Sequence, residues 1–262
     1  MKYYYREHIA GYERVRTEGK LAWHTIHNGK PFDDSPSRAF LEYSLPRLEL
    51  EEARPRVLEI GCGTGVGACF LAQRGFQVTA IDLIPTAIEI AKKVAAERDL
   101  DISFQVQDVC DLPLQGGRYD LIVDSYCLQA IVFDEERARV FAGVRARLRA
   151  HGYYLVSTAM FDENRFRQDE RVPDEPTGLV YHRYGDKGLI EAATGVVYVE
   201  LEESPDLYEG ATEIAGTWYL PSRRHLRPPA LRGELEAAGF AVLYQDEEHG
   251  EHVICALASP AP

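Results

Sequence analysis

The chain has 262 residues, of which 45% are hydrophobic and 27% are charged, and its formal net charge is −13. This length suits one large domain with a full core, and the acidic balance argues against a nucleic-acid partner, which needs a basic surface to displace counterions. No apolar run reaches the roughly 18 residues that cross a membrane. Residues 1–10 also lack the apolar centre of a signal peptide, so the sequence predicts a cytoplasmic protein.

The cysteines are scattered along the chain, and none forms a Cys-x-x-Cys pair. They are Cys62, Cys69, Cys110, Cys127 and Cys255. An odd, dispersed set is typical of reduced thiols rather than of a disulfide framework or a zinc site. We therefore predict no bound metal.

Residues 1–50 are rich in aromatic and histidine side chains and predict two or three short helices before the main sheet. The apolar residues between Phe40 and Leu48 suggest that the last of these helices packs on that sheet.

A glycine-rich turn follows, in which residues 57–67 read Val-Leu-Glu-Ile-Gly-Cys-Gly-Thr-Gly-Val-Gly. The apolar residues before Gly61 predict a short buried strand, and the run from Val66 predicts the start of a helix. Glycine tolerates positive φ and the close approach of a ligand. The spacing of Gly61, Gly63 and Gly65 therefore predicts a ligand site at the helix N-terminus.

The residues around this turn select the kind of ligand. The dinucleotide fingerprint needs a glycine where this chain has Val66, and the Gly-Lys-Ser/Thr ending of a phosphate-binding loop is absent. Glu59, just before the first glycine, would repel a pyrophosphate but can hold a cation. A ligand with an ammonium or sulfonium group therefore fits the turn better than a phosphorylated one.

The complete motif resembles the first motif of the class I S-adenosylmethionine-dependent methyltransferases. The resemblance implies a Rossmann-like α/β fold, with a doubly wound seven-stranded sheet that ends in a C-terminal antiparallel hairpin. It implies S-adenosyl-L-methionine as cofactor and S-adenosyl-L-homocysteine as product. Glu59, Cys62 and the three glycines would then contact the methionine end, and residues 1–50 would form a helical lid over the cofactor.

Three further predicted strands, at residues 77–83, 102–109 and 119–126, each carry an acidic residue near the end: Asp82, Asp108 and Asp124. Asp82 lies 21 residues beyond Gly61, where a carboxylate can accept both hydroxyls of a ribose. By the resemblance, Asp82 and Leu83 bind the ribose, and Asp108 and Val109 bind the adenine. Asp124 and Ser125 would face the cofactor amino group and the acceptor.

The rest of the chain predicts a helix at residues 134–150, whose arginines between Arg137 and Arg149 we expect on a solvated face, and a fifth strand at 153–160. A long segment then precedes a helix at 229–238 and two closing strands at 241–245 and 253–258. Within it, residues 197–201 and 212–219 suggest strands, so we predict a folded, β-containing insertion. The predicted organisation is a lid (1–50), a cofactor-binding core (51–160), a substrate-pocket insertion (161–225) and the end of the core sheet (226–262).

Methyl transfer from a sulfonium needs alignment of the two reactants and exclusion of water. Aromatic rings suit the cationic sulfur, and Trp23 and Tyr126 are the first candidates. An acidic acceptor would also need a base, for which we consider His24, His27, His182 and His225. Candidate substrate contacts are Tyr4, Tyr5, Gln129, His182, Arg183, Arg223 and Arg224.

The sequence thus predicts a methyltransferase acting on a small-molecule acceptor, at nitrogen or oxygen, and leaves a homodimer open. A metal-assisted, catechol-type O-methyltransferase is an alternative, because Asp124, Asp162 and Asn164 loosely resemble that family's acidic cluster. An aminopropyl-type transferase and a non-catalytic cofactor-binding protein are two others. Glu59 and Val66 disfavour a nicotinamide oxidoreductase.

Overall fold

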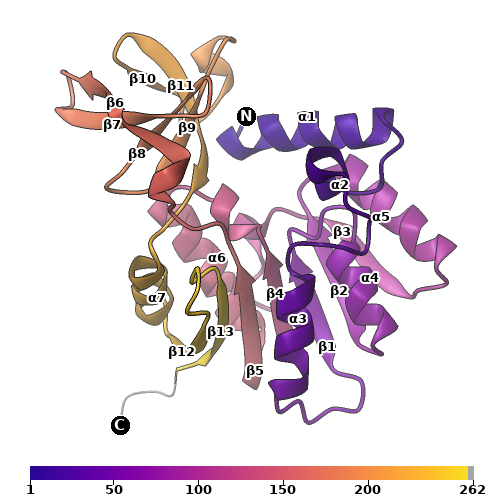
Figure 1. The fold of residues 1–262 in the computed structure, drawn as a ribbon. Helices are drawn as coiled ribbons and strands as arrows, with labels where there is room; N and C mark the ends of the chain where they lie inside the picture. The colour runs from indigo at the N-terminus through magenta and orange to yellow at the C-terminus, as the bar shows by residue number, and fades with distance from the viewer. Residues whose placement is uncertain (259–262) are drawn as a thin grey trace.

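A seven-stranded sheet forms the centre of the molecule in a computed structural model that describes residues 1–258, without the side chains of residues 27–28 and 166–168 (Figure 1). The strand order is β12-β13-β5-β4-β1-β2-β3, and the strands from β5 to β3 are parallel. The two C-terminal strands pair antiparallel, which confirms the predicted hairpin. The strand bounds are Arg56–Ile60 (β1), Gln77–Asp82 (β2), Ile102–Val106 (β3), Tyr119–Ser125 (β4), Leu148–Ser157 (β5), Phe240–Gln245 (β12) and His252–Leu257 (β13).

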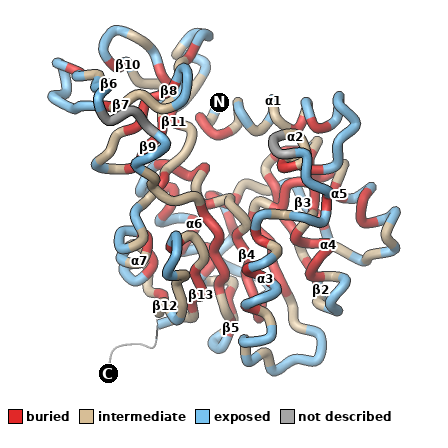
Figure 2. The backbone as a smooth tube through the Cα atoms, in the orientation of Figure 1, coloured by how far each residue is buried: buried red, intermediate tan, exposed pale blue. Residues whose placement is uncertain are grey.

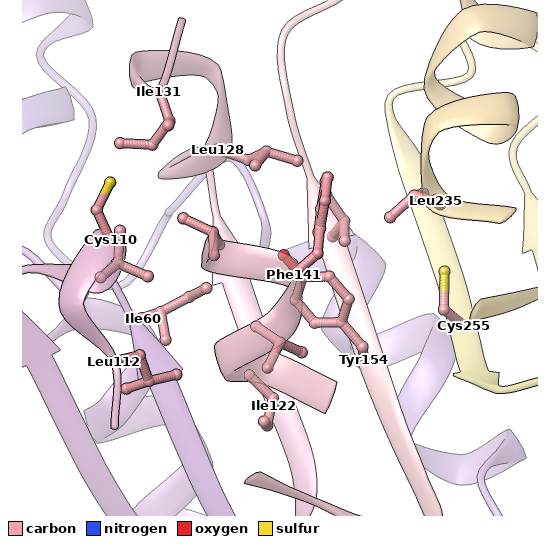
Figure 3. Packing of buried hydrophobic residues seen from close by; sticks show 14 of the residues in the cluster. Ile60, Cys110, Leu112, Ile122, Leu128, Ile131, Phe141, Tyr154, Leu235 and Cys255 are labelled. Atoms are coloured by element: carbon pink, nitrogen blue, oxygen red, sulfur yellow. The ribbon is translucent and has the colours of Figure 1, made fainter. Parts of the chain in front are cut away.

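Helices cover both faces of this sheet. They are α3 (Arg38–Ser44), α4 (Val66–Gln73), α5 (Pro85–Glu97), α6 (Asp134–Arg147) and α7 (Pro228–Ala237). Neighbouring residues of β1 point to opposite faces, so Val57 packs in one core with α3, α4 and α5, and Leu58 in another with α6 and α7. Figure 3 shows the second core, where Ile60 and Ile122 of the sheet lie near Phe141 of α6. The buried residues follow the central strands (Figure 2).

The arginine-rich helix differs from the sequence expectation in two ways. It ends at Arg147, so residues 148–150 already belong to β5. Arg137 is only 2% exposed, which contradicts its predicted place on a solvated face. Its guanidinium bonds Glu234 of α7 at 2.5 and 2.6 Å and the carbonyl oxygens of Leu128 and Ile131 at 2.8 and 2.9 Å. A buried guanidinium is tolerated here because this carboxylate and these carbonyls satisfy it.

The insertion is a second, antiparallel sheet of six strands in the order β10-β11-β9-β8-β7-β6. The bounds are Phe166–Asp174 (β6), Leu179–Tyr184 (β7), Gly188–Glu191 (β8), Val196–Glu200 (β9), Thr212–Ile214 (β10) and Thr217–Arg224 (β11). Its own small core contains Tyr181, Leu189, Ile214 and Tyr219. The sequence therefore predicted correctly that the insertion contains strands, but it indicated only two of the six.

Two helices, α1 (Tyr3–Thr17) and α2 (Trp23–Asn28), precede the core. Figure 1 shows α1 running across the core, from the six-stranded sheet towards α5. Long-range bonds hold it there: the Tyr3 hydroxyl donates to Glu136 of α6 at 2.7 Å, and Arg223 of β11 pairs with Glu7 at 2.7 Å. In the part of the chain that the structure describes, none of the helices combines the length and apolar composition needed to span a bilayer.

Candidate functional site

A cavity of 720 Å³ lies where the parallel strands end, between the sheet and the lid helices. Its size is within the range of small-molecule sites, about 300–1,000 Å³. The core contributes Glu59, Gly61, Cys62, Gly63, Asp82, Leu83, Asp108, Val109, Ser125, Tyr126 and Gln129. The other walls come from the lid (Tyr4, His8, Tyr12, Trp23, His24) and from the insertion (Arg165, Arg223). Nine of these core residues, all except Tyr126 and Gln129, are ones for which the sequence predicted a place in the cofactor site.

The glycine turn has the backbone that the motif predicts. Gly61, Gly63 and Gly65 have φ angles of 63°, 54° and 82°. A Cβ atom at Gly61 would lie 2.5 Å from that of Cys127, so a side chain does not fit there. Gly65 is the N-cap residue that precedes α4, and it faces Phe104 rather than the cavity. The absence of side chains thus lets neighbouring residues pack directly against the turn and allows the positive φ angles with which the chain enters the helix.

Glu59 is buried beneath this turn, with its carboxylate over Gly67 at the start of α4. Burial is the main cause that raises the pKa of Glu59 to about 8; a hydrogen bond from the Ala68 backbone opposes the shift, and the charges of Asp82 and Asp124 add to it. Its Oε2 atom has no hydrogen-bond partner among the described residues. A buried, unpaired carboxylate oxygen at a cavity wall fits a cationic ligand group.

Asp82, at the end of β2, links this strand to the glycine turn. Its Oδ2 accepts from the Gly63 N–H at 2.8 Å, and its Oδ1 accepts from the Ile84 N–H at 2.9 Å. Burial raises its pKa to about 6, although these two hydrogen bonds lower it. Asp82 therefore shapes the turn and also presents carboxylate to the cavity.

Asp108 follows β3 and connects the core to the lid. It accepts from the Cys110 N–H at 2.8 Å and from the Tyr4 hydroxyl at 2.8 Å. Tyr4 thus lies beside the residues for which the resemblance implies adenine contacts, and Tyr5 stacks on it with ring centroids 5.7 Å apart, outside the cavity wall.

Asp124 does not line the cavity. Its oxygens accept from the backbone N–H groups of Cys127 at 2.8 Å and Leu128 at 3.2 Å, and from the Tyr154 hydroxyl at 3.3 Å. Burial raises its pKa to about 7. These bonds fix the turn after β4, in which Tyr126 has a φ of 65°.

Ser125 and Tyr126 both reach the cavity from this turn. The Ser125 hydroxyl oxygen is buried and has no partner among the described residues, so it is available to a ligand. The Tyr126 hydroxyl lies 3.5 Å from Glu251, and Gln129 accepts from the Ala159 N–H at 3.3 Å.

The lid contributes two residues that the sequence reading missed, His8 and Tyr12. With Tyr4 they occur at four-residue intervals, so one face of α1 points into the cavity. Trp23 of α2 packs on both, with ring centroids 5.7 Å from His8 and 5.2 Å from Tyr12. The spacing was visible in the sequence, but the surface that this face covers was not.

The predicted histidines and arginines are dispersed. His24 lines the cavity with Nε2 at 2.9 Å from the Pro31 carbonyl oxygen, and the side chain of His27 is outside the described residues. Arg223 lines the cavity, and the sequence reading missed Arg165, which also does. The remaining candidates lie outside the cavity wall: His182, Arg183, Arg224 and His225.

The residues named for a metal-assisted mechanism are not brought together. Asp162 accepts from the Asn164 backbone and side chain at 2.9 and 3.0 Å, whereas Asp124 is occupied by its own turn. Among the side chains that the structure describes, no three of His, Cys, Asp or Glu are placed to share a metal ion. Nothing in this geometry supports the catechol-type alternative.

Comparison with known proteins gives a consistent result. Residues 57–152 match a family model described as a methyltransferase domain. The chain is 32% identical over 126 residues to the 2-heptyl-1-hydroxyquinolin-4(1H)-one methyltransferase of Mycobacteroides abscessus, and this match covers 48% of the chain and 54% of that protein. It is 34% identical over 119 residues to a ubiquinone biosynthesis O-methyltransferase of Xanthomonas euvesicatoria, covering 45% of the chain and 48% of that protein. The chain thus spans about half the length of these relatives.

The structural comparison extends over nearly the whole chain. An S-adenosylmethionine-dependent methyltransferase from Clostridium acetobutylicum superimposes with a TM-score of 0.61 over 95% of this chain and 99% of its own. The two are 13% identical, so this likeness establishes the fold.

Proposed function

We propose that the chain is a class I S-adenosylmethionine-dependent methyltransferase that transfers a methyl group from S-adenosyl-L-methionine to a small molecule. The match of residues 57–152 to a methyltransferase domain model supports this proposal, as does the shared fold. The observation that carries this proposal is a pair of buried polar atoms without partners in the described structure, Glu59 Oε2 and Ser125 Oγ. Both residues line the cavity, and buried polar atoms are rarely left unpaired in proteins. A ligand with an ammonium group would satisfy both.

The other cavity residues fit the remaining parts of this cofactor. Asp82 and Leu83 would hold the ribose, and Asp108 with Val109 would hold the adenine. When bound, this cofactor would supply a methyl group that its sulfonium already activates for displacement. Trp23 and Tyr126, which line the same cavity, would exclude water and place aromatic faces near the positive charge.

The acceptor is a small molecule in this proposal, methylated at nitrogen or oxygen. The lid and the insertion both contribute residues to the wall, and the volume of 720 Å³ suits a small molecule rather than a polymer. The names of the two relatives above, a hydroxyquinolinone methyltransferase and an O-methyltransferase of ubiquinone biosynthesis, support a small acceptor.

Calorimetric titration with S-adenosylmethionine and S-adenosylhomocysteine tests the proposal. We expect both to bind the intact protein and to lose most of their affinity for an Asp82→Ala variant. Asp101→Ala, which changes an exposed carboxylate outside the cavity wall, is the matched control. Failure of the intact protein to bind either compound would refute the assignment.

A further inference from the structure

We infer that the acceptor carries an acidic hydroxyl group, whose proton passes to Nε2 of His8 in a cavity whose wall also carries Arg165. The inference rests on the proposed methyl transfer and adds the class of acceptor and the residue that takes its proton.

Hydrogen bonding fixes the tautomer of His8. Its Nδ1 lies 2.5 Å from the carbonyl oxygen of Tyr4, one turn earlier in α1. A carbonyl oxygen only accepts, so Nδ1 must carry the proton, and the neutral ring then has its lone pair on Nε2. Within the described chain Nε2 has no hydrogen-bond partner, and the side chain lines the cavity. His8 therefore offers a proton acceptor where a ligand would lie.

The surroundings of His8 keep it in this neutral form. Burial lowers its pKa, and the charge of Arg223 lowers it further, whereas the Tyr4 carbonyl and the Glu7 carboxylate raise it. Trp23 covers the ring from α2 and carries no charge. The imidazole is thus unprotonated at neutral pH, and Glu7 is close enough to stabilise the imidazolium once a proton arrives.

Two guanidinium groups line the cavity with His8, and they differ in how far their charge is already neutralised. Arg223 donates to both oxygens of Glu7, at 2.7 and 2.9 Å. Arg165 lies 3.5 Å from Asp162, and its side chain is 59% exposed, so it can turn towards an anion in the cavity. An oxyanion would be stabilised beside Arg165, whereas an ammonium group would be repelled. This contrast favours an acidic hydroxyl over an amine as the group to be methylated.

In this step His8 acts as a general base. The O–H bond of the acceptor breaks, its proton bonds to Nε2, and its electron pair stays on oxygen. That oxygen forms the bond to the methyl carbon of the sulfonium donor as the C–S bond breaks and leaves its pair on sulfur. The imidazolium then returns the proton to solvent.

4-Nitrophenol tests this inference without turnover, because its ionised form has its own visible absorption band. Protein saturated with S-adenosylhomocysteine is mixed with the phenol at a pH below the pKa of the free phenol. We expect the phenolate band to grow several-fold over that in buffer. The growth should disappear in His8→Gln, whose amide cannot take a proton, and should fall several-fold in Arg165→Gln. Arg232→Gln, which removes an exposed charge on α7, should behave like the unchanged protein.

Two results would overturn the inference while leaving the cofactor assignment intact. One is a protein that binds S-adenosylhomocysteine but binds the phenol in its neutral form or not at all. The other is a phenolate band that persists in His8→Gln and disappears in His24→Gln, which would assign the base to His24. Loss of S-adenosylhomocysteine binding by the unchanged protein would instead refute the proposed function.

Discussion

The hydroxyl group of Tyr12 in the lid lies directly against Gly63 in the glycine turn. A Cβ atom at Gly63 would be 2.5 Å from the Tyr12 oxygen, which is closer than any normal contact. The lid therefore packs on backbone rather than on a side chain, and its position depends on the absence of that one carbon.

Replacing Gly63 with alanine should separate the lid from the turn. The φ of 54° at this residue adds a strain of about 1–2 kcal/mol for alanine. We expect the affinity for S-adenosylhomocysteine to fall roughly tenfold or more, since overpacking of this kind costs about 1–3 kcal/mol. Calorimetry measures the affinity of Gly63→Ala and of Gly63→Ala/Tyr12→Phe. The difference between the two gives the part of the loss that is due to the clash, because the second change removes the clashing oxygen. Unchanged affinity in the single variant would mean that the lid is not held by this contact.

Glu59→Gln should stabilise the protein without cofactor and weaken cofactor binding. The pKa of Glu59 is raised from 4.5 to about 8, so its contribution to stability is fully present below pH 4.5 and is lost as pH rises through about 8. Each pKa unit corresponds to about 1.4 kcal/mol, and glutamine cannot ionise. The difference in unfolding temperature between variant and unchanged protein should therefore grow in favour of the variant from pH 5 to 9. Parallel stability curves would show that Glu59 is not buried in its neutral form.

Arg137→Met should destabilise the core strongly. Removing the guanidinium leaves Glu234 unpaired and takes a donor from the carbonyl oxygens of Leu128 and Ile131. The Leu128 oxygen keeps the Ile131 N–H at 3.1 Å. Breaking a buried pair of this kind costs about 3–5 kcal/mol, which urea unfolding measures directly. Arg139→Met on the same helix is the control, because that side chain is half exposed and pairs with Glu136 at 3.7 Å. It should cost less than about 1 kcal/mol. Equal effects of the two changes would contradict the structure.

Gly11→Ala should disturb the lid although it favours the helix. Alanine stabilises a helix interior by about 1 kcal/mol relative to glycine. At this position, however, its Cβ atom would lie 2.0 Å from a ring carbon of Trp23. We expect Trp23 to be displaced and S-adenosylhomocysteine to bind about 1–3 kcal/mol more weakly. Adding Trp23→Leu should relieve the clash, and intrinsic tryptophan fluorescence follows the displacement. If Gly11→Ala binds as tightly as the unchanged protein, α2 does not depend on this contact.

The core and the strand ends that line the cavity could be predicted because their signals are local. β1 and β4 are short apolar runs that end at glycine or acidic residues, and parallel strands place all these ends at one edge of the sheet. Asp82 and Asp108 reach the cavity for this reason alone. Asp124 shows the limit of the pattern, since a carboxylate at a strand end can equally bond the turn that follows it.

The remaining features depend on contacts between distant parts of the chain. β6 is rich in charged residues, so it carries little apolar signal until its neighbours in the sheet are known. The partner of Arg137 lies 97 residues away, and nothing near Arg137 in the sequence reveals it. His8 belongs to the cavity because distant residues hold α1 in place, among them Arg223 of β11, which pairs with Glu7.

The attachment of α1 also has a consequence for the order of folding. Its bonds reach Glu136, Glu203 and Arg223, which lie 133, 197 and 216 residues from their partners in α1, so these contacts close long loops. We therefore expect the sheet to form first and α1 to dock last, as a late step that completes the binding site rather than a nucleus that starts the fold. Pulsed hydrogen exchange during refolding should show the amides of β1 and β4 protected before those of α1; earlier protection of α1 would reverse this order.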